Sequence, residues 1–447
     1  MRIRITEQEL TESSLADICM RIEDMRNRIL KLKSYYLGQH IILNKPQRSN
    51  NAPNNKVVAN YCEYITDMST GFFMGKPIAY ASASKNEEEV KALQDIFKYN
   101  DEAAHNLRLA EEASITGAAY EVLYMDEDAQ IRFSAIPSEE LMMVYDASLE
   151  EKVLCAIRLF RVYDPSGATY QDYADVYDRQ NVTHYYYNSG QLVQIAEPEL
   201  HYFDDVPVIE YLNNREERGD FEGVITLVDA YNKAQSLTLD DMEDFTDAYL
   251  VLKGMGGTTG DDVAELRRNK VLSLDEGGGA EWLIKNLNDT YIENIKTRLQ
   301  KDIHKFSSVP DMSDEAFAGN ATGVAIKYKL IGLEQVRSRK ERGFKKGLQR
   351  RIELIAGMLK IKGSADIDFR DIEITFTANL PANDVEQANI VKTLYGLVSQ
   401  KRLLSLLPFV TDPVEELDEL HKEQEEQLND AAGGEANDER GILGQEE

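Results

Sequence analysis

The chain has 447 residues, of which 43% are hydrophobic and 29% are charged, and its formal net charge at pH 7 is -29. A chain of this length can bury a large core and is expected to divide into two to four domains. The acidity argues against a protein that wraps nucleic acid with Lys and Arg, but it does not exclude one past which DNA slides without sticking.

The three cysteines, Cys19, Cys62 and Cys155, lie far apart and form no C-x-x-C pair. This pattern favours reduced thiols and gives neither a zinc ribbon nor a disulfide framework. The N-terminus lacks the apolar core of a signal peptide, and no apolar run approaches membrane-spanning length. We therefore expect a soluble protein that is intracellular where it is made and does not enter a membrane.

The N-terminal part of the chain is predicted to be mainly helical. Apolar residues spaced by three and four predict helices over about 13–37, 56–73 and 87–116, and the asparagine-rich segment 44–55 predicts an exposed loop. From 118 to 213 the pattern changes to short strands. A hairpin is expected over 120–133, and strands follow at 153–163, 173–177 and 183–187. Because strand follows strand with tight turns, we expect an antiparallel sheet and an α+β fold.

Two long amphipathic helices and a small insert come next. The stripe from Phe221 to Tyr249 predicts a helix of roughly 45 Å, and polar residues enter this stripe in its middle. Residues 250–286 read as a small α/β unit, and 289–308 form the second helix. The segment 309–323, with a proline, a polar run and a glycine, predicts a loop at which the chain turns.

After this hinge, a helix is predicted to about residue 360. Its apolar stripe fails at 337–343, where we expect the helix either to kink or to cross between two environments. A strand is expected over 366–377 and a helix over 381–407. From about 415 the chain is predicted to be a polar helix that fades into a disordered acidic tail.

No stretch has a catalytic pattern. The segment from Gly71 to Pro77 is one residue too short for a phosphate-binding loop, and Pro77 replaces the hydroxyl that would hold magnesium. The acids within 240–244 lie on one helix and point in several directions, so a solvated face is a better interpretation than a two-metal nuclease site. The six histidines share no metal-ligand spacing. We expect no enzyme activity, no cofactor and no metal.

The segment 327–351 is basic within this acidic chain, with only Glu334 and Glu341 opposing its Lys and Arg residues. One interpretation is a solvated helix face. The other is a basic band that faces an acidic surface on a neighbouring subunit, or DNA phosphate.

Several segments together resemble the portal proteins of tailed bacteriophages, in the branch typical of long-tailed phages of Gram-positive hosts. The resemblance rests on NYCEYITD at 60–67, GFFMGKPI at 71–78, AYEVLY at 119–124 and, most specifically, VPDM at 309–312 followed by FAGNATGVAIKY at 317–328. The order of predicted elements agrees across nearly the whole chain.

The resemblance implies a portal-type ring of about twelve subunits at one capsid vertex, assembled in the host cytoplasm, through which double-stranded DNA is packaged and ejected. The implied partners are the terminase large subunit, a head-completion or adaptor protein, and the major capsid and scaffolding proteins. The implied domains are a mixed α/β wing (1–220 and 324–380), a helical stem (221–249 and 289–308), a small α/β clip (250–288), the hinge (309–323), a helical crown (381–430) and a disordered tail (431–447).

Three sets of residues are expected to serve this function. The DNA-facing tunnel loop would contain Val309, Asp311, Met312, Asp314, Glu315 and Asn320. The channel-facing stem acids would be Asp240, Asp241, Asp244 and Asp247. The basic band would pair across subunits, or with DNA, through Arg337, Arg339, Lys340, Arg342, Lys345 and Lys346.

Two other classes remain open at this stage. One is an enzyme of DNA packaging, either a motor ATPase or a nuclease, although the chain lacks a Walker loop and a carboxylate constellation. The other is a structural shell or scaffolding protein, from which a closed ring with a DNA-wide hole would distinguish a portal.

Overall fold

The computed structural model describes residues 3–47, 52–245, 249–253, 259–261, 279–283, 289–313, 323–379, 384–404, 407, 410, 416–417, 419–420 and 422. The chain divides into two units, 1–379 and 380–447, and each is described by itself. Among the described helices, none combines the length and the apolar character needed to cross a membrane.

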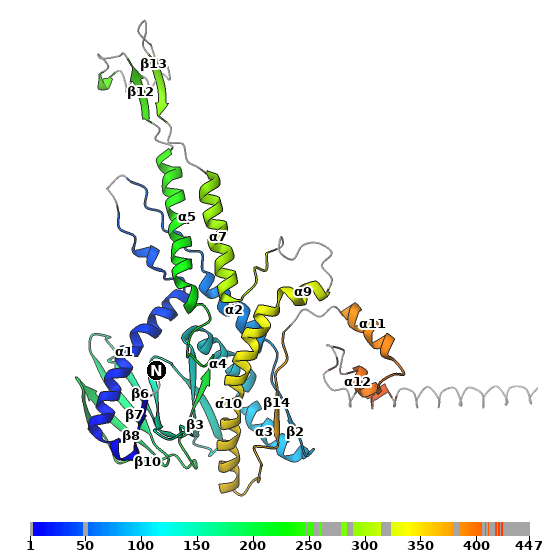
Figure 1. Ribbon diagram of the computed structural model, residues 1–447. Coiled ribbons are helices and arrows are strands. Elements are labelled where there is room, and N and C mark those ends of the chain that lie inside the picture. Colours follow the sequence, from blue (N-terminus) through cyan, green and yellow to red (C-terminus); the bar gives the residue numbers. More distant parts are fainter. Residues whose placement is uncertain are drawn as a thin grey trace, which may run out of the picture. The chain divides into compact units, whose positions relative to one another are not determined.

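Two sheets form the centre of the first unit (Figure 1). The larger sheet has the strand order β1 (Ile3–Ile5), β5 (Leu141–Asp146), β6 (Val153–Tyr163), β7 (Tyr170–Tyr177), β8 (Asn181–Asn188) and β10 (Glu199–Leu200), and β9 (Gln191–Gln194) also pairs with β8. The smaller sheet has the order β11 (Val208–Leu212), β3 (Ala118–Met125) and β4 (Ile131–Ile136). The predicted hairpin and the three predicted strands are therefore confirmed.

The sheets pack face to face because successive side chains of their strands point to opposite sides. In β3, Tyr120 packs toward the larger sheet, whereas Ala119 and Leu123 pack toward the helices on the other side. The prediction of one antiparallel sheet was incomplete, since two sheets are stacked and β1 joins β5 in parallel.

Helices cover both outer faces. The helix α1 (Glu12–Tyr36) covers the larger sheet, and α4 (Glu102–Thr116) and α10 (Ile331–Ile361) cover the smaller sheet. The helix α2 (Tyr61–Met74) packs against both α4 and α10. The single helix predicted over 87–116 is wrong. It is divided into α3 (Glu87–Tyr99) and α4, because Asp101 between them has a left-handed φ of 50°.

The remaining elements of the first unit include the two long helices that were predicted to form a stem. The helices α5 (Ile225–Phe245) and α7 (Asp289–Ser307) pack side by side (Figure 1). The predicted helix over 221–249 is too long, because a 3-10 turn, η3 (Glu222–Val224), precedes α5 and Tyr249 begins a strand. The strand pairs are β12 (Tyr249–Lys253) with β13 (Gly279–Leu283), and β2 (Ala79–Ser82) with β14 (Ile372–Thr375). The other short helices are η1 (Glu7–Glu9), η2 (Ile41–Asn44) and α9 (Gly323–Lys329).

The second unit contains α11 (Asp384–Leu394) and α12 (Gln400–Leu404). A single helix was predicted here. The chain instead turns between the two helices, where Gly396 has a left-handed φ of 81°.

Cys19, Cys62 and Cys155 are free and buried. Burial raises the pKa of each thiol to about 12. These residues therefore behave as small core side chains, with little thiolate character.

The helix α10 continues without a break across 337–343. Its packed face continues there through Lys340, which is 3% exposed, and Gly343. A Cβ at Gly343 would collide with the carbonyl oxygen of Leu212 in β11. The apolar stripe fails in the sequence because the contact surface at this point consists of a buried cation and a glycine.

The substitution Gly343→Ala is expected to destabilise the first unit by about 1–3 kcal/mol, because backbone atoms of α10 and β11 must separate to admit the methyl group. Urea unfolding of purified protein measures the change. Gly71→Ala is the matched control, since Gly71 also lies within a helix and a Cβ there meets nothing within 4 Å. It should be neutral or slightly stabilising. Equal effects at the two positions would contradict the packing argument.

Candidate functional site

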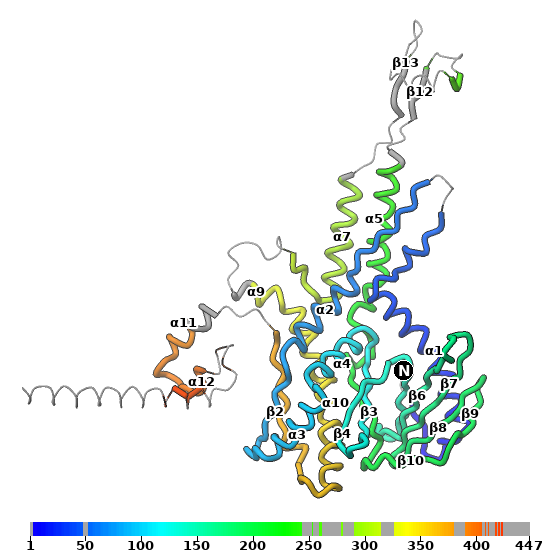
Figure 2. Tube along the Cα trace, turned by 180° about the vertical axis from the view of Figure 1, so that it is seen from behind, coloured from blue at the N-terminus to red at the C-terminus, as the bar shows by residue number. Residues whose placement is uncertain are grey.

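The polar residues in the middle of α5 hold an extended segment, residues 52–60, which we call the strap. Figure 2 shows this segment, in blue, running beside α5. Backbone amides of the strap donate to α5 side chains at three steps: Ala59 to Asn232 (2.8 Å), Val57 to Ser236 (2.9 Å) and Asn55 to Asp240 (2.7 Å).

The spacing of the acceptors along α5 matches the spacing of the amides along the strap. Four residues of an α-helix rise about 6 Å, and two residues of extended chain span about 6.6 Å. Every fourth side chain of α5 therefore meets every second amide of the strap. Each buried amide obtains the hydrogen bond that it would otherwise lack. The polar residues within the predicted stripe are Gln235 and Thr238, so the sequence gave no indication of the ladder.

Asp240 lies at one end of this ladder and is 3% exposed. Its carboxylate forms an ion pair with Lys45 and accepts from the amide and side chain of Asn55. Burial favours a higher pKa for Asp240, but the hydrogen bonds from Lys45 and Asn55 and the charge of Lys45 outweigh it and lower the pKa. The expectation that Asp240 faces a channel is corrected, since its charge is used within the subunit.

The other predicted stem acids are placed only in part. Asp241 is half-buried and has an interaction partner of its own. The side chain of Asp244 and the whole of Asp247 lie outside the described residues.

The other end of the strap is tied to α1 and α2 through the buried side chain of His40. Its Nδ1 accepts from the Asn232 amide group (2.8 Å), and its Nε2 donates to the carbonyl oxygen of Tyr35 (2.9 Å). Asn60 caps α2, because its side-chain oxygen accepts from the amide of Glu63. The strap therefore joins the stem helix directly to the first turn of α2.

Residues 307–312, which end α7 and include the start of the predicted hinge (309–323), are firmly held, and we call this segment the hinge base. The hydroxyl of Tyr64 in α2 donates to the carbonyl oxygen of Pro310 (2.8 Å) and accepts from the amide of Met312 (3.0 Å). His304 in α7 lies 3.0 Å from the carbonyl oxygen of Val309 through its Nδ1. The hydrogen bonds of the hinge base are therefore supplied by α2 and α7 together.

The chain turns sharply at Ser308, which has a left-handed φ of 61° although it is not a glycine. Gly332 at the start of α10 packs against this turn, since a Cβ there would lie 3.0 Å from the carbonyl oxygen of Ser308. The helix that enters the hinge and the helix that follows it therefore meet at the same backbone turn.

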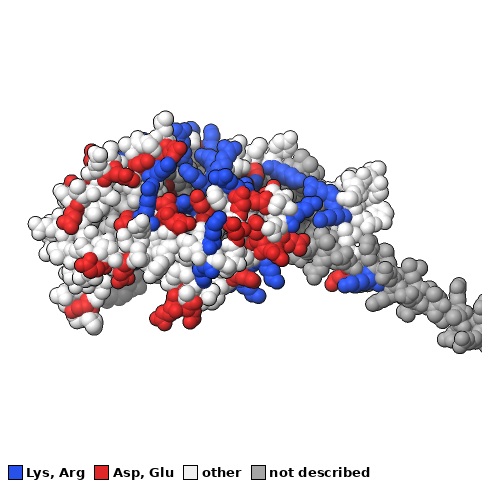
Figure 3. Space-filling view, turned by 90° about the horizontal axis from the view of Figure 1, so that it is seen from below, with Lys and Arg blue, Asp and Glu red and all other residues white. Residues whose placement is uncertain are grey.

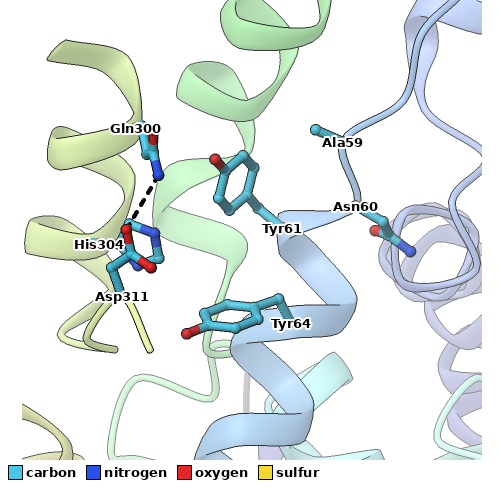
Figure 4. A pocket seen from close by; sticks show the side chains of 7 residues that line it. All are labelled: Ala59, Asn60, Tyr61, Tyr64, Gln300, His304 and Asp311. Carbon is cyan, nitrogen blue, oxygen red and sulfur yellow. Dashed lines mark hydrogen bonds between the residues drawn. The ribbon is translucent and has the colours of Figure 1, made fainter. Parts of the chain in front are cut away.

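A pocket of about 250 Å³ lies between the start of α2 and the end of α7 (Figure 4). Its lining residues are Ala59, Asn60, Tyr61, Tyr64, Gln300, His304 and Asp311. Tyr61 and Tyr64 extend from α2 toward α7, and each ring meets His304 edge to face at 5.7 Å. The Gln300 side chain donates to the Asp311 carboxylate at 3.2 Å. Burial raises the pKa of Tyr61 and of Tyr64, so both hydroxyls stay protonated.

The six predicted tunnel-loop residues have different environments. Val309 is 1% exposed, so the expectation that it faces DNA is corrected: it packs inside the subunit. Asp311 lines the pocket, and Met312 is 37% exposed. Asp314, Glu315 and Asn320 lie outside the described residues.

The basic band on α10 also contains residues in different environments, since some are paired within the subunit and others are not. Lys340 is buried and pairs with Asp220 (2.5 Å) and Asn213 (2.7 Å), so the expectation that it reaches another subunit or DNA is corrected. Arg337 is neutralised by Glu334 and Glu341 of its own helix, which corrects the same expectation for it. Figure 3 shows basic and acidic side chains lying close together over the face in view.

Four basic residues of α10 remain without such a partner. Arg339, Arg342 and Lys346 are exposed, and Lys345 is half-buried. Within the described part of the chain, no ion pair or hydrogen bond involves their side chains. Their spacing places Arg339, Arg342 and Lys346 on one side of the helix.

A second buried cation, Arg351, was missed. It is fully buried, donates to Glu121 in β3 (2.9 Å) and to Asn106 in α4 (2.9 Å), and lies over the ring of Phe133. The charge of Arg351 and hydrogen bonds from His105 and Arg351 outweigh the effect of burial and keep the pKa of Glu121 low. The signal was present, since Arg351 interrupts the apolar stripe and Glu121 occupies an inward position of an apolar strand.

Nothing in this arrangement resembles a catalytic centre. In the described ranges, no group of three or more His, Cys, Asp or Glu side chains is placed to hold a metal ion.

The comparisons with known proteins agree with the resemblance seen in the sequence. The family model described as "Phage portal protein, SPP1 Gp6-like" matches residues 18–430. This chain belongs to that family. It is similar to the portal protein of Clostridium phage phiCD119, at 25% identity over 89% of this chain and 93% of the relative. It is also similar to the portal protein of Bacillus phage SPP1, at 26% identity over 88% of this chain and 80% of the relative.

Among solved structures, the neck of a native gene transfer agent particle computed with C12 symmetry aligns at a TM-score of 0.44 and 12% identity, covering 78% of this chain and 89% of that one. The predicted family is thus confirmed by the family match and its two phage relatives. The protein is a phage portal protein, a structural component of the virion at the capsid vertex.

The substitution Asp240→Ala is expected to destabilise the stem and strap by about 1–2 kcal/mol, because it leaves Lys45 and the Asn55 amide without their acceptor. The pKa of Asp240 is lowered in the folded state. Its contribution is therefore present above the ordinary aspartate pKa of about 4 and is lost as the pH falls below it.

Urea unfolding at pH 7 and at decreasing pH measures this effect. Lys233→Ala, at an exposed position of the same helix, is the control and should change little. If Asp240→Ala were as stable as the control at neutral pH, the ladder would not stabilise the fold.

Proposed function

We propose that this protein forms a closed ring of about twelve copies around a channel through which double-stranded DNA is packaged and later ejected. The observation that carries the proposal is the family match over residues 18–430. The paired helices α5 and α7 support it, since long antiparallel helices with small cores of their own suit packing beside neighbouring copies.

In this proposal, the body built from 1–220 and 324–380 is the wing, α5 and α7 form the stem, and the insert 250–288 is the clip. The clip would meet the terminase large subunit and later the head-completion or adaptor protein. Residues 381–430 would form the crown, and the wing would face the major capsid and scaffolding proteins. The protein would act on DNA only as a conduit and would have no enzymatic activity.

The acids Asp241, Asp244 and Asp247 remain proposed channel residues, as do Asp314, Glu315 and Asn320 in the tunnel loop. Acidic walls would keep contacts with phosphate weak, and tight binding would stall a moving duplex. A packaging ATPase or nuclease is the alternative. Absence of ATP hydrolysis and DNA cleavage by the pure protein would argue against it.

The ring predicts a definite particle mass. Light scattering of the purified protein is expected to give about 600 kDa, which is twelve times 50.7 kDa, and negative-stain images should show a central hole. A protein that stays monomeric with its terminase and capsid partners present would contradict the proposal.

The acidic tunnel loop predicts weak DNA binding. Changing Asp314 and Glu315 to Lys in the assembled ring should raise its affinity for short duplex DNA at low salt and steepen the salt dependence, by a slope of up to about 0.9 per added phosphate contact. Fluorescence anisotropy with a labelled duplex measures this.

The control for loop position changes Glu87 and Glu88 to Lys, at exposed positions of α3, and alters the net charge equally. If both pairs of substitutions raised DNA affinity to the same extent, net charge and not the loop would be responsible.

A further inference from the structure

The pocket at the hinge base is shaped and charged to receive a cation. Three of its lining residues carry aromatic rings, Tyr61, Tyr64 and His304, and a fourth, Asp311, carries a carboxylate. None of the lining residues is Lys or Arg. An aromatic wall beside a carboxylate is a favourable setting for a guanidinium or ammonium group.

The carboxylate of Asp311 accepts fewer hydrogen bonds than it can. Asp311 accepts from the Gln300 side chain and from the backbone amide of Ser313 (2.9 Å), which are both uncharged donors. A carboxylate can accept about four hydrogen bonds. No Lys or Arg in the described ranges forms an ion pair with it.

The pocket also has a fixed shape. Tyr64 is held by Pro310 and Met312, and the strap and the Asn60 cap fix the first turn of α2. A pocket that is already formed loses little conformational entropy on binding. A group that entered it would be held at the base of the hinge itself.

The same chain offers cations of the right kind. Arg339 and Arg342 are exposed on α10 and have no ionic partner among the described residues. The planar guanidinium of Arg can stack on a tyrosine ring and bind a carboxylate with two hydrogen bonds, which Lys cannot do. A second copy of the chain, beside the first in a ring, would present these side chains.

We propose that Arg339 or Arg342 of a neighbouring copy enters the pocket and pairs with Asp311. This contact rests on the proposed ring. It links the hinge base of each subunit to α10 of the next subunit, so that the hinges around the ring are mechanically connected. Gly332, near the start of α10, packs against the turn at Ser308 in its own subunit's hinge base. A shift of one hinge is therefore passed through α10 to the next subunit.

The test is a double-mutant cycle on ring stability, with mass photometry of serially diluted full-length protein. Asp311→Asn keeps the shape of the side chain and removes its charge. It is expected to raise the concentration at which rings dissociate by roughly tenfold or more. Arg339→Gln or Arg342→Gln should raise this concentration by a similar factor. When Asp311→Asn is combined with the variant of the arginine that contacts it, the increase should be clearly smaller than the product of the two single increases.

Controls separate the contact from local structure. Asp302→Asn, at a half-buried acid of α7 that lies 3.9 Å from Arg298, should leave the rings unchanged. Gln300→Ala removes only the local hydrogen bond to Asp311 and should have a much smaller effect than Asp311→Asn. Urea unfolding of each variant checks that the fold itself is intact.

Two results would overturn the inference. One is rings of Asp311→Asn that are as stable as those of Asp302→Asn. The other is additive effects of Asp311→Asn with both arginine variants, since the arginines would then act elsewhere. In both cases wild-type rings form and the proposed function stands. If the wild-type protein forms no ring with its partners present, the proposed function fails first.

Discussion

The match between α5 and the strap is the interaction on which the rest of this region depends. An extended segment that belongs to no sheet has unpaired amides, and burying them costs free energy unless each finds an acceptor. Asn232, Ser236 and Asp240 supply acceptors at the repeat of the helix, and the strap supplies amides at the repeat of extended chain. The ladder turns a loop into a rigid connection, so that the stem helix and the first turn of α2 behave as one body.

The two buried cations of α10 place a similar constraint on the packing of this helix against the smaller sheet. Lys340 pairs with Asp220, and Arg351 pairs with Glu121, each in an environment closed to water. A shift of α10 by one turn would leave buried charges without partners, at a cost of about 3–5 kcal/mol for each broken pair. Close packing of Gly343 on Leu212 adds a steric limit. The helix that follows the hinge is therefore fixed in register against the smaller sheet.

The sequence was sufficient for the family, for most helices and for the strands with clear alternation, because these depend on local periodicity and on long matching segments. It failed where a polar residue has a distant partner. Asp240 and Lys340 looked like surface charges because their partners, Lys45 and Asp220, lie far away in the chain. The pocket was equally hidden, since it combines residues near 60 with others near 300. The break at Asp101 was missed because a left-handed φ at one non-glycine residue leaves little signal in the sequence.

These constraints make the hinge a loop with a fixed base. Tyr64 from α2, His304 from α7 and Gly332 from α10 all meet the segment around Ser308 to Met312. The base is tied through the strap to α5 and through α10 to the smaller sheet. A force on the base is therefore passed to α5 and to α10. A conduit whose subunits must respond together would need such a base in every subunit.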